Sequence, residues 1–539
     1  MKKFLPDLIA ILAFIILSFA YFFPADIEGR ILFQHDTAAG VGAGQESKEY
    51  LERTGERTRW TNSIFGGMPT YQMSPSYDST TSLKGVEKVY RLFLPDYVVL
   101  TFIMMLGFYI LLRAFGISAW LAGLGGVIWA FSSYFFILIP AGHIWKFVTL
   151  AYIPPTIAGV VLAYRKKYLL GGIVTALFIA LQIQSNHIQM SYYFMFVILF
   201  FVGAYFEDAY KKKELPHFFK ASGVLALAAV VGVCINISNL YHTYEYSKET
   251  MRGKSELKQE GAAASQTSSG LDRDYITNWS YGIGETLTLL VPNVKGGGSG
   301  STMSQSEAAM AKANPMYNGI YSQLPQYFGE QPWTAGPVYV GAFVMFLFVL
   351  GCFIVKGPLK WALLGATIFS ILLSWGKNFM GLTDFFIDYV PMYNKFRAVS
   401  SILVIAEFTI PLLAIFALKE ILSKPDMLKQ EKNCRGVIAA LVLTAGVALI
   451  LAVAPGTFFS SFITTQEMTA LKQALPAEHL APFVANLTEM REAIIASDAW
   501  RSFFIIVIGC LFLFLYQLRK LKASFTLAGI ALLCLIDMW

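Results

Sequence analysis

The sequence predicts an all-α, polytopic membrane protein with about thirteen transmembrane helices. Of its 539 residues, 56% are hydrophobic and only 14% are charged, against about 25% charged residues in soluble domains. The apolar residues fall in uncharged blocks of roughly 17–22 residues, long enough to cross a bilayer. Lys and Arg gather in every second connection. These three observations exclude a soluble enzyme, a disordered chain, a coiled coil and a small disulfide scaffold.

The first apolar block follows Lys2 and Lys3, as in a signal peptide. No small-x-small cleavage site follows it, so we interpret it as a retained anchor. The predicted spans cover residues 5–24, 97–113, 118–139, 147–164, 168–184, 187–205, 219–240, 336–355, 359–375, 400–418, 436–454, 501–517 and 523–539.

The basic residues predict a cytoplasmic N-terminus by the positive-inside rule. The basic residues of the predicted inner connections are Arg113, Arg165, Lys166, Lys167, Lys211, Lys212, Lys213, Lys356, Lys360, Lys419, Lys424, Lys429, Lys432, Arg435, Arg519, Lys520 and Lys522. They are spread between apolar blocks, so the net charge of +7 gives no indication of a nucleic-acid partner.

The polar segments between the predicted spans are therefore expected to lie mainly outside the cytoplasm, in predicted outer loops 25–96, 241–335, 376–399 and 455–500. The inner loops are short, and the sequence contains no P-loop or dinucleotide fingerprint. We expect one membrane domain over residues 1–539, with its chemistry on the extracytoplasmic side. Two surface helices are expected in the first outer loop: one with mixed charges from about residue 45, and an amphipathic one over 83–95.

Asp36 is the candidate catalytic residue of the first outer loop, with His35 beside it. A carboxylate near the membrane surface can act as a general base toward a hydroxyl, or hold a divalent metal with a neighbouring histidine. A solvated loop aspartate is the alternative. No Cys/His cluster indicates zinc.

His143 and Lys146 occupy one predicted outer span mouth, and His187 occupies the next. A shared polar pocket and simple snorkelling of polar side chains explain this equally well.

Lys395 and Arg397 break the positive-inside trend, because they lie in an outer connection. We interpret them as contacts for a lipid phosphate or pyrophosphate, with headgroup anchoring as the alternative. Glu407 follows inside the predicted span, where a carboxylate is a candidate functional group for a pocket or a metal. Pairing with Arg397 or a neighbouring helix is its alternative.

The chain resembles the YfhO family of bacterial membrane proteins, within the GT-C class of glycosyltransferases, and its Bacteroidetes-type members in particular. The local strings that carry the resemblance are Phe33 to Asp36, Trp60 to Gln72, Asn186 to Gln189, Glu285 to Asn293, Gly329 to Tyr339, and Lys395 to Arg397.

This resemblance implies a GT-C-like fold in the bacterial inner membrane, a polyprenyl-phosphate sugar donor and a catalytic acidic residue at Asp36. It implies transfer to a cell-envelope polysaccharide or glycolipid outside the membrane. The chain has a single His-Asp where the class has a tandem acidic pair, so Mg²⁺ or Mn²⁺ dependence stays open. Family members usually continue further, and no loop follows the apolar run ending at Asp537 to Trp539; we therefore expect a C-terminally truncated chain.

Three hypotheses follow. The first is an inverting glycosyltransferase in which Asp36 acts on the acceptor hydroxyl, while Lys395, Arg397, His143, Lys146 and His187 contact the donor. The second is a transporter or lipid flippase, which needs polar groups or broken helices near the midplane. The third is a scaffold that assembles envelope machinery without catalysis.

Overall fold

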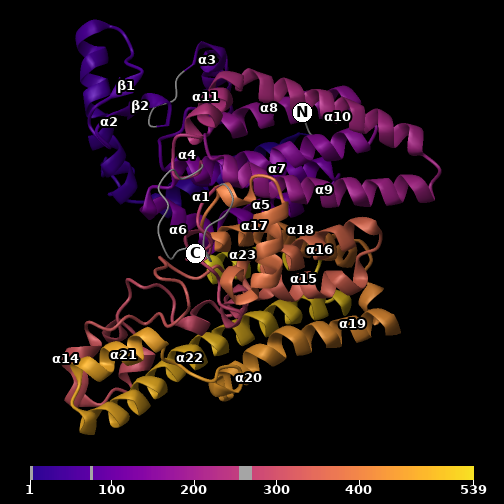
Figure 1. The fold of residues 1–539 in the computed structure, drawn as a ribbon. Coiled ribbons are helices and arrows are strands. Elements are labelled where there is room, and N and C mark those ends of the chain that lie inside the picture. The colour runs from indigo at the N-terminus through magenta and orange to yellow at the C-terminus, as the bar shows by residue number, and fades with distance from the viewer. Residues whose placement is uncertain (1–3, 73–76, 254–269) are drawn as a thin grey trace. The chain divides into compact units, whose positions relative to one another are not determined.

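The computed structural model describes residues 4–72, 77–253 and 270–539. Its contacts divide the chain into two compact units. The first comprises Met1–Ala130, Phe135–Arg273 and Pro391–Phe396, and the second comprises Phe131–Tyr134, Asp274–Val390 and Arg397–Trp539. Both units are helical (Figure 1), and the described residues contain one small sheet of two strands.

Each predicted span contains an apolar helix. Seven helices of the described chain are long and apolar enough to cross a membrane, or up to nine if each of two bent pairs is one span. A helical protein with many apolar, membrane-length helices is thereby confirmed, whereas the full set of thirteen spans and the GT-C fold stay predictions. The seven are α1 (Leu5–Phe22), α7 (Ile144–Tyr164), α9 (Ile188–Lys211), α10 (Leu215–Ile235), Val399–Ser423 with α18 (Val404–Ser423), Glu431–Val453 with α19 (Glu431–Leu441) and α20 (Val447–Val453), and α22 (Ala477–Gln517).

Two pairs of helices are bent, and four further apolar helices have only 10–17 residues. The bent pairs are α5 (Ala119–Ala130) with α6 (Ser133–Ala141), at 48°, and α16 (Pro358–Ser374) with Gly376–Tyr389, which contains α17 (Met380–Tyr389), at 109°. The shorter helices are α4 (Val98–Ala114), α8 (Tyr168–Gln184), α15 (Ala342–Ile354) and α23 (Ala523–Met538).

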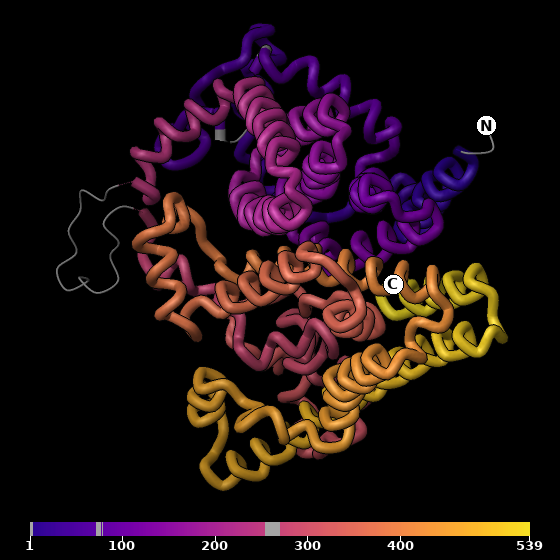
Figure 2. The backbone as a smooth tube through the Cα atoms, turned by 90° about the vertical axis from the view of Figure 1, so that its right-hand side faces the viewer, coloured from indigo at the N-terminus to yellow at the C-terminus, as the bar shows by residue number. Residues whose placement is uncertain are grey.

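In the first unit, the membrane-length window of α7 is buried throughout, and α7 packs against α4 and α8. Figure 2 traces the same backbone from a second side. Glycine allows the close approach of α7 and α8. A Cβ on Gly159 would lie 2.3 Å from Thr175 Oγ1, and one on Gly171 would lie 2.5 Å from the Ala163 nitrogen. Small residues at such crossings let two helix backbones meet.

The polar part of the first unit contains α2 (His35–Thr54), a hairpin of β1 (Trp60–Thr61) and β2 (Met68–Pro69), α3 (Thr81–Tyr90) and α11 (Ile237–Ser247). The amphipathic helix expected over 83–95 is confirmed as α3, which ends at Tyr90. The helix expected from about residue 45 begins earlier, at His35. Gly40, Gly42 and Gly44 disfavour helix locally, which is why sequence periodicity missed its first turns.

In the second unit, α22 runs for 41 residues, about 60 Å at the helical rise. The predicted span 501–517 is its C-terminal part. The predicted outer loop 455–500 contains α21 (Thr465–Ala474) and the N-terminal half of α22, with short helices α12 (Arg273–Thr277), α13 (Glu307–Met310) and α14 (Asn318–Tyr321) elsewhere in the unit.

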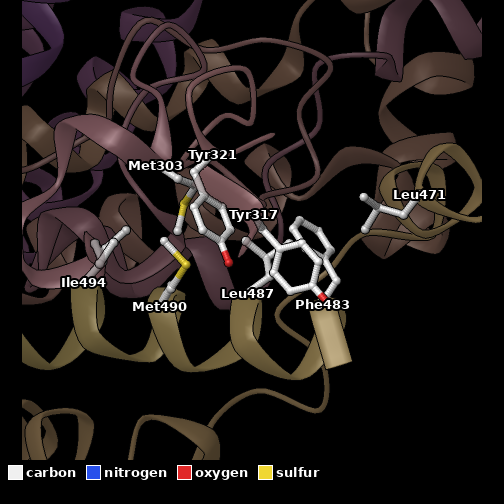
Figure 3. Close-up of a cluster of buried hydrophobic side chains, with 9 residues drawn as sticks. Met303, Tyr317, Tyr321, Leu471, Phe483, Leu487, Met490 and Ile494 are labelled. Atoms are coloured by element: carbon white, nitrogen blue, oxygen red, sulfur yellow. The ribbon is translucent and has the colours of Figure 1, made fainter. Parts of the chain in front are cut away.

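A hydrophobic cluster holds the N-terminal half of α22 against the segment that carries α13 and α14. Figure 3 shows Phe483, Leu487 and Met490 of α22 directed at Tyr317 and Tyr321. The Tyr321 and Phe483 rings stack with centroids 5.9 Å apart. The cluster contains Met303, Ala309, Tyr317, Tyr321, Leu471, Phe483, Leu487, Met490 and Ile494.

A buried ion pair lies beside this cluster. The fully buried Arg491 donates to both carboxylate oxygens of Glu467 at 2.7 Å, so α21 is fixed to α22 by a bidentate contact. We interpret this part of the second unit as a folded polar subdomain.

Candidate functional site

Asp36 lies in the first turn of α2, in the first unit. The helix start is fixed by its neighbour Gln34, which is buried and donates from Nε2 to the Ile139 carbonyl at 2.7 Å. Gln34 Oε1 accepts a hydrogen bond from Thr37 Oγ1 at 2.9 Å. Gly142 adopts φ +81°, and a Cβ there would lie 2.9 Å from the Thr37 nitrogen. The turn after α6 can therefore approach the α2 start closely only with glycine at this position.

The carboxylate of Asp36 meets the His143 ring. Its Oδ2 lies 3.0 Å from His143 Nε2, and its Oδ1 lies 3.5 Å from His35 Nδ1. The Asp36 and His143 side chains are 56% and 47% exposed, so a ligand in solvent can reach both. A carboxylate hydrogen-bonded to an imidazole can orient the ring and accept or pass a proton.

Lys146 and His187 extend this group of side chains. Lys146 is 9% exposed, one turn into α7, and His187 precedes α9. Burial, and then the charges of Lys146 and His143, lower the pKa of His187 to about 3. The ring is therefore neutral at pH 7 and cannot offset phosphate charge, although it can still donate or accept a hydrogen bond. We call Asp36, His35, His143, Lys146 and His187 the histidine cluster.

Lys395 and Arg397 make contacts of a different kind. Lys395 Nζ donates to the Arg252 carbonyl at 2.7 Å, and Arg252 Nε donates to the Lys395 carbonyl at 3.0 Å. Burial lowers the pKa of Lys395. In the second unit, Arg397 donates to Tyr275 Oη at 2.7 Å and stacks over that ring. Convergence of these two cations with Asp36 stays a prediction.

Glu407 is fully buried at the start of α18 and accepts a hydrogen bond from Ser132 Oγ at 2.5 Å. Ser132 lies at the break between α5 and α6. Of the two alternatives the sequence left open, pairing with a neighbouring polar group is the contact observed, and its partner is a serine. Within residues 4–72, 77–253 and 270–539, no group of three or more His, Cys, Asp or Glu side chains is arranged to hold a metal ion. A divalent cation stays an open prediction.

The second unit contains a carboxylate site that chemical reasoning from the sequence missed. Glu285 is 2% exposed and accepts hydrogen bonds from Tyr327 Oη and the Gly282 nitrogen at 2.6 Å, and from the Glu330 nitrogen at 3.3 Å. We call these groups the Glu285 cluster. The strings 285–293 and 329–339, singled out only by resemblance, supply Glu285 and Glu330, whereas Gly282 and Tyr327 lie just before them. Two glycines, Gly282 and Gly284, directly before a lone glutamate were the available signal.

A second buried network joins α22 to α23. Arg501 donates to Asp498 at 2.8 Å and to Asp537 at 2.5 Å, and Asp537 accepts from Tyr339 Oη at 2.7 Å. Asp498 also accepts from the Asn293 nitrogen at 2.6 Å. Every polar group in it has a protein partner, as expected of a structural element.

A cleft of about 380 Å³ lies in the first unit, between α3, the start of α7 and the end of α8. Eight of its ten lining residues carry polar groups on their side chains. In its wall, Arg91 donates to Glu87 Oε1 at 2.5 Å and to Tyr152 Oη at 3.2 Å, and Tyr152 Oη donates to the same oxygen at 2.8 Å. The lining residues are Thr80, Lys84, Glu87, Arg91, Ile144, Trp145, Val148, Gln184, Ser185 and Asn186.

Comparison of the chain with models of protein families, with curated proteins and with solved structures finds no match.

Proposed function

We propose that the chain is a membrane glycosyltransferase of the GT-C class, similar to the YfhO family. It would move a sugar from a polyprenyl-phosphate donor to a cell-envelope acceptor on the extracytoplasmic face of the bacterial inner membrane. The observation that carries the proposal is the hydrogen bond between Asp36 Oδ2 and His143 Nε2, at 3.0 Å. It gives a solvent-accessible carboxylate a fixed orientation.

In this mechanism, Asp36 accepts the proton of the acceptor hydroxyl. The hydroxyl oxygen forms a bond to the anomeric carbon, and the bond from that carbon to the phosphate oxygen breaks. The electron pair stays on the departing lipid phosphate. Because the hydroxyl attacks the face opposite to the phosphate, the anomeric configuration inverts. His143 holds the Asp36 carboxylate through its hydrogen bond.

Positive groups would offset the charge on the departing phosphate. Lys146, at the start of α7, is the cation of the histidine cluster. Lys395 and Arg397 serve as further phosphate contacts in the proposal. His187 acts as a neutral hydrogen-bonding group, because its lowered pKa leaves it uncharged.

The test is the Asp36→Asn variant, reconstituted in vesicles with polyprenyl-phosphate hexoses and envelope fractions as acceptor. Loss of a general base costs about 10²–10⁴-fold in rate, so we expect transfer to fall by that factor with unchanged thermal unfolding. Asp272→Asn, an exposed carboxylate of the same unit, is the matched control and should keep full transfer. Full turnover in folded Asp36→Asn protein would remove Asp36 from the catalytic role.

A second candidate function is transport of a lipid or solute. Two bent helix pairs and the buried contact between Glu407 and Ser132 favour it, because broken helices and intramembrane carboxylates are typical of transport sites. The same vesicles separate the two functions. A transporter moves its substrate across the bilayer without forming a glycosidic bond, and it loses this activity in Glu407→Gln but not in Asp36→Asn.

A further inference from the structure

The cleft between α3, α7 and α8 has no role in the mechanism above. From its lining we infer that it binds a neutral, hydroxyl-rich ligand, namely a hexopyranose unit. Its assignment to the sugar that is transferred, or to the one that accepts, rests on the proposed function. The volume of about 380 Å³ is at the small end of ligand pockets, which span ~300–1,000 Å³.

The first argument is an amide that lacks a partner. Gln184 ends α8 and lines the cleft, and its buried Oε1 has no hydrogen-bond partner among the described residues. Burying an amide end without a partner is destabilising, so such a group indicates a missing ligand. A sugar hydroxyl, which both donates and accepts, satisfies an amide in either orientation.

The second argument is a carboxylate with spare acceptor capacity. Glu87 Oε1 accepts from Arg91 and from Tyr152. In the described chain no hydrogen bond is formed by its other oxygen, Oε2, although the residue lines the cleft. A carboxylate oriented in this way by two donors accepts bonds from hydroxyl groups, and it repels a phosphate.

The third argument is an aromatic surface. Trp145 lines the cleft at the start of α7 and is 45% exposed. An exposed indole beside amides and a carboxylate offers a flat apolar face to the C–H face of a pyranose ring, while the polar groups bind its hydroxyls.

The charges of the lining also favour a neutral ligand. Of the two cations, Arg91 is engaged by Glu87 and Tyr152, and Lys84 is solvent-exposed. With Glu87 present, the lining carries little net positive charge for an anion.

The cleft adjoins the histidine cluster along the chain. Ile144 and Trp145 directly follow His143, and Asn186 directly precedes His187. A sugar in the cleft would therefore be bound by the same two connections that carry the candidate catalytic and electrostatic groups.

Saturation-transfer NMR on the full chain, in a detergent without a sugar headgroup, tests this inference. The probes are methyl glycosides of glucose, mannose, galactose and N-acetylglucosamine. Inorganic phosphate and phosphatidylglycerol vesicles serve as competing probes. We expect at least one glycoside to bind, and Trp145→Ala and Gln184→Leu to weaken that binding by about tenfold or more.

Trp120→Ala and Gln473→Leu are the matched controls, because both residues are exposed and lie outside the cleft. They should leave glycoside binding unchanged. Binding that is equal in the cleft variants, displacement of the glycoside by phosphate or by anionic vesicles, or no glycoside binding in the wild type would each overturn the inference.

The binding assay requires no turnover, so its result does not depend on whether the proposed glycosyl transfer is correct. Asp36→Asn should retain glycoside binding. If transfer proves independent of Asp36 while Trp145→Ala loses the glycoside, the mechanism is wrong and the sugar site remains. If transfer depends on Asp36 but the wild type binds no glycoside, only the sugar site is wrong.

Discussion

The two units contain one acidic site each, and the two carboxylates have opposite surroundings. Asp36 in the first unit is 56% exposed and contacts two histidine rings. Glu285 in the second unit is 2% exposed and accepts three hydrogen bonds from a tyrosine and two backbone N–H groups. Buried polar groups with complete hydrogen bonding stabilise a fold, whereas an accessible carboxylate with spare acceptor capacity is available to a substrate.

The two carboxylates show why resemblance to a family and reasoning from residue chemistry select different residues. The strings around Glu285 are among those by which the sequence resembles the YfhO family, but their contacts are those of a structural support. The string that ends at Asp36 contributes to the same resemblance, and its carboxylate reaches solvent. A shared pattern therefore mixes residues that hold the fold with residues that can act on a substrate, and burial distinguishes the two.

Removal of Glu285 is the variant for which we expect the largest effect on stability. Glu285→Ala leaves the Tyr327 hydroxyl and two backbone N–H groups without their acceptor, so we expect a loss of about 3 kcal/mol or more in the free energy of unfolding. Asp36→Ala should change it by less than about 0.5 kcal/mol, as at other accessible sites. Thermal unfolding of both variants in the same detergent measures the difference. Equal losses would contradict the division into a structural and an accessible carboxylate.

The Gly329→Ala variant tests the Glu285 cluster without removing a hydrogen-bonding group. A Cβ at Gly329 would lie 2.3 Å from both Glu285 Oε1 and Tyr327 Oη. These atoms must move apart, and we expect a loss of about 1–3 kcal/mol, typical of overpacking.

Gly300→Ala is the matched control for this variant, since an added Cβ meets nothing within 4 Å there. Circular dichroism melts should show a clear fall for Gly329→Ala and little change for Gly300→Ala. If both variants melt at the temperature of the wild type, the packing around Glu285 is loose enough to accept an added methyl group at position 329.

The sequence predicted the helical membrane character well, because uncharged apolar blocks are a local signal. It also placed Asp36, His143, Lys146 and His187 near span mouths, and these residues do lie together in the first unit. The first turns of α2 were missed because three glycines lower its helix propensity. Only the fold brings Glu87 and Trp145 to Gln184, since Trp145 lies 58 positions after Glu87 and 39 positions before Gln184 in the sequence.

The Glu285 cluster could not be predicted from residue chemistry for a related reason. Two of its three donors are backbone N–H groups, which leave no trace in a sequence, and Tyr327 is one of 27 tyrosines. The same holds for Ser132, whose contact with Glu407 depends on the break between α5 and α6.

The smallest expected effect concerns pH and the histidine cluster. His187 has a pKa of about 3 in the folded protein, because burial and the positive charge of Lys146 oppose its protonation, against 6.5 for an ordinary histidine. As the pH falls below 6.5, the unfolded chain binds a proton that the folded chain does not, so the folded state loses stability between pH 6.5 and pH 3. In His187→Gln this contribution is absent.

The melting temperature should therefore fall more between pH 7 and pH 5 in the wild type than in His187→Gln. His479 is an exposed histidine of the second unit, so the control variant His479→Gln should behave like the wild type. An identical pH dependence in the wild type and His187→Gln would mean that the ring is solvated and that its pKa is not lowered.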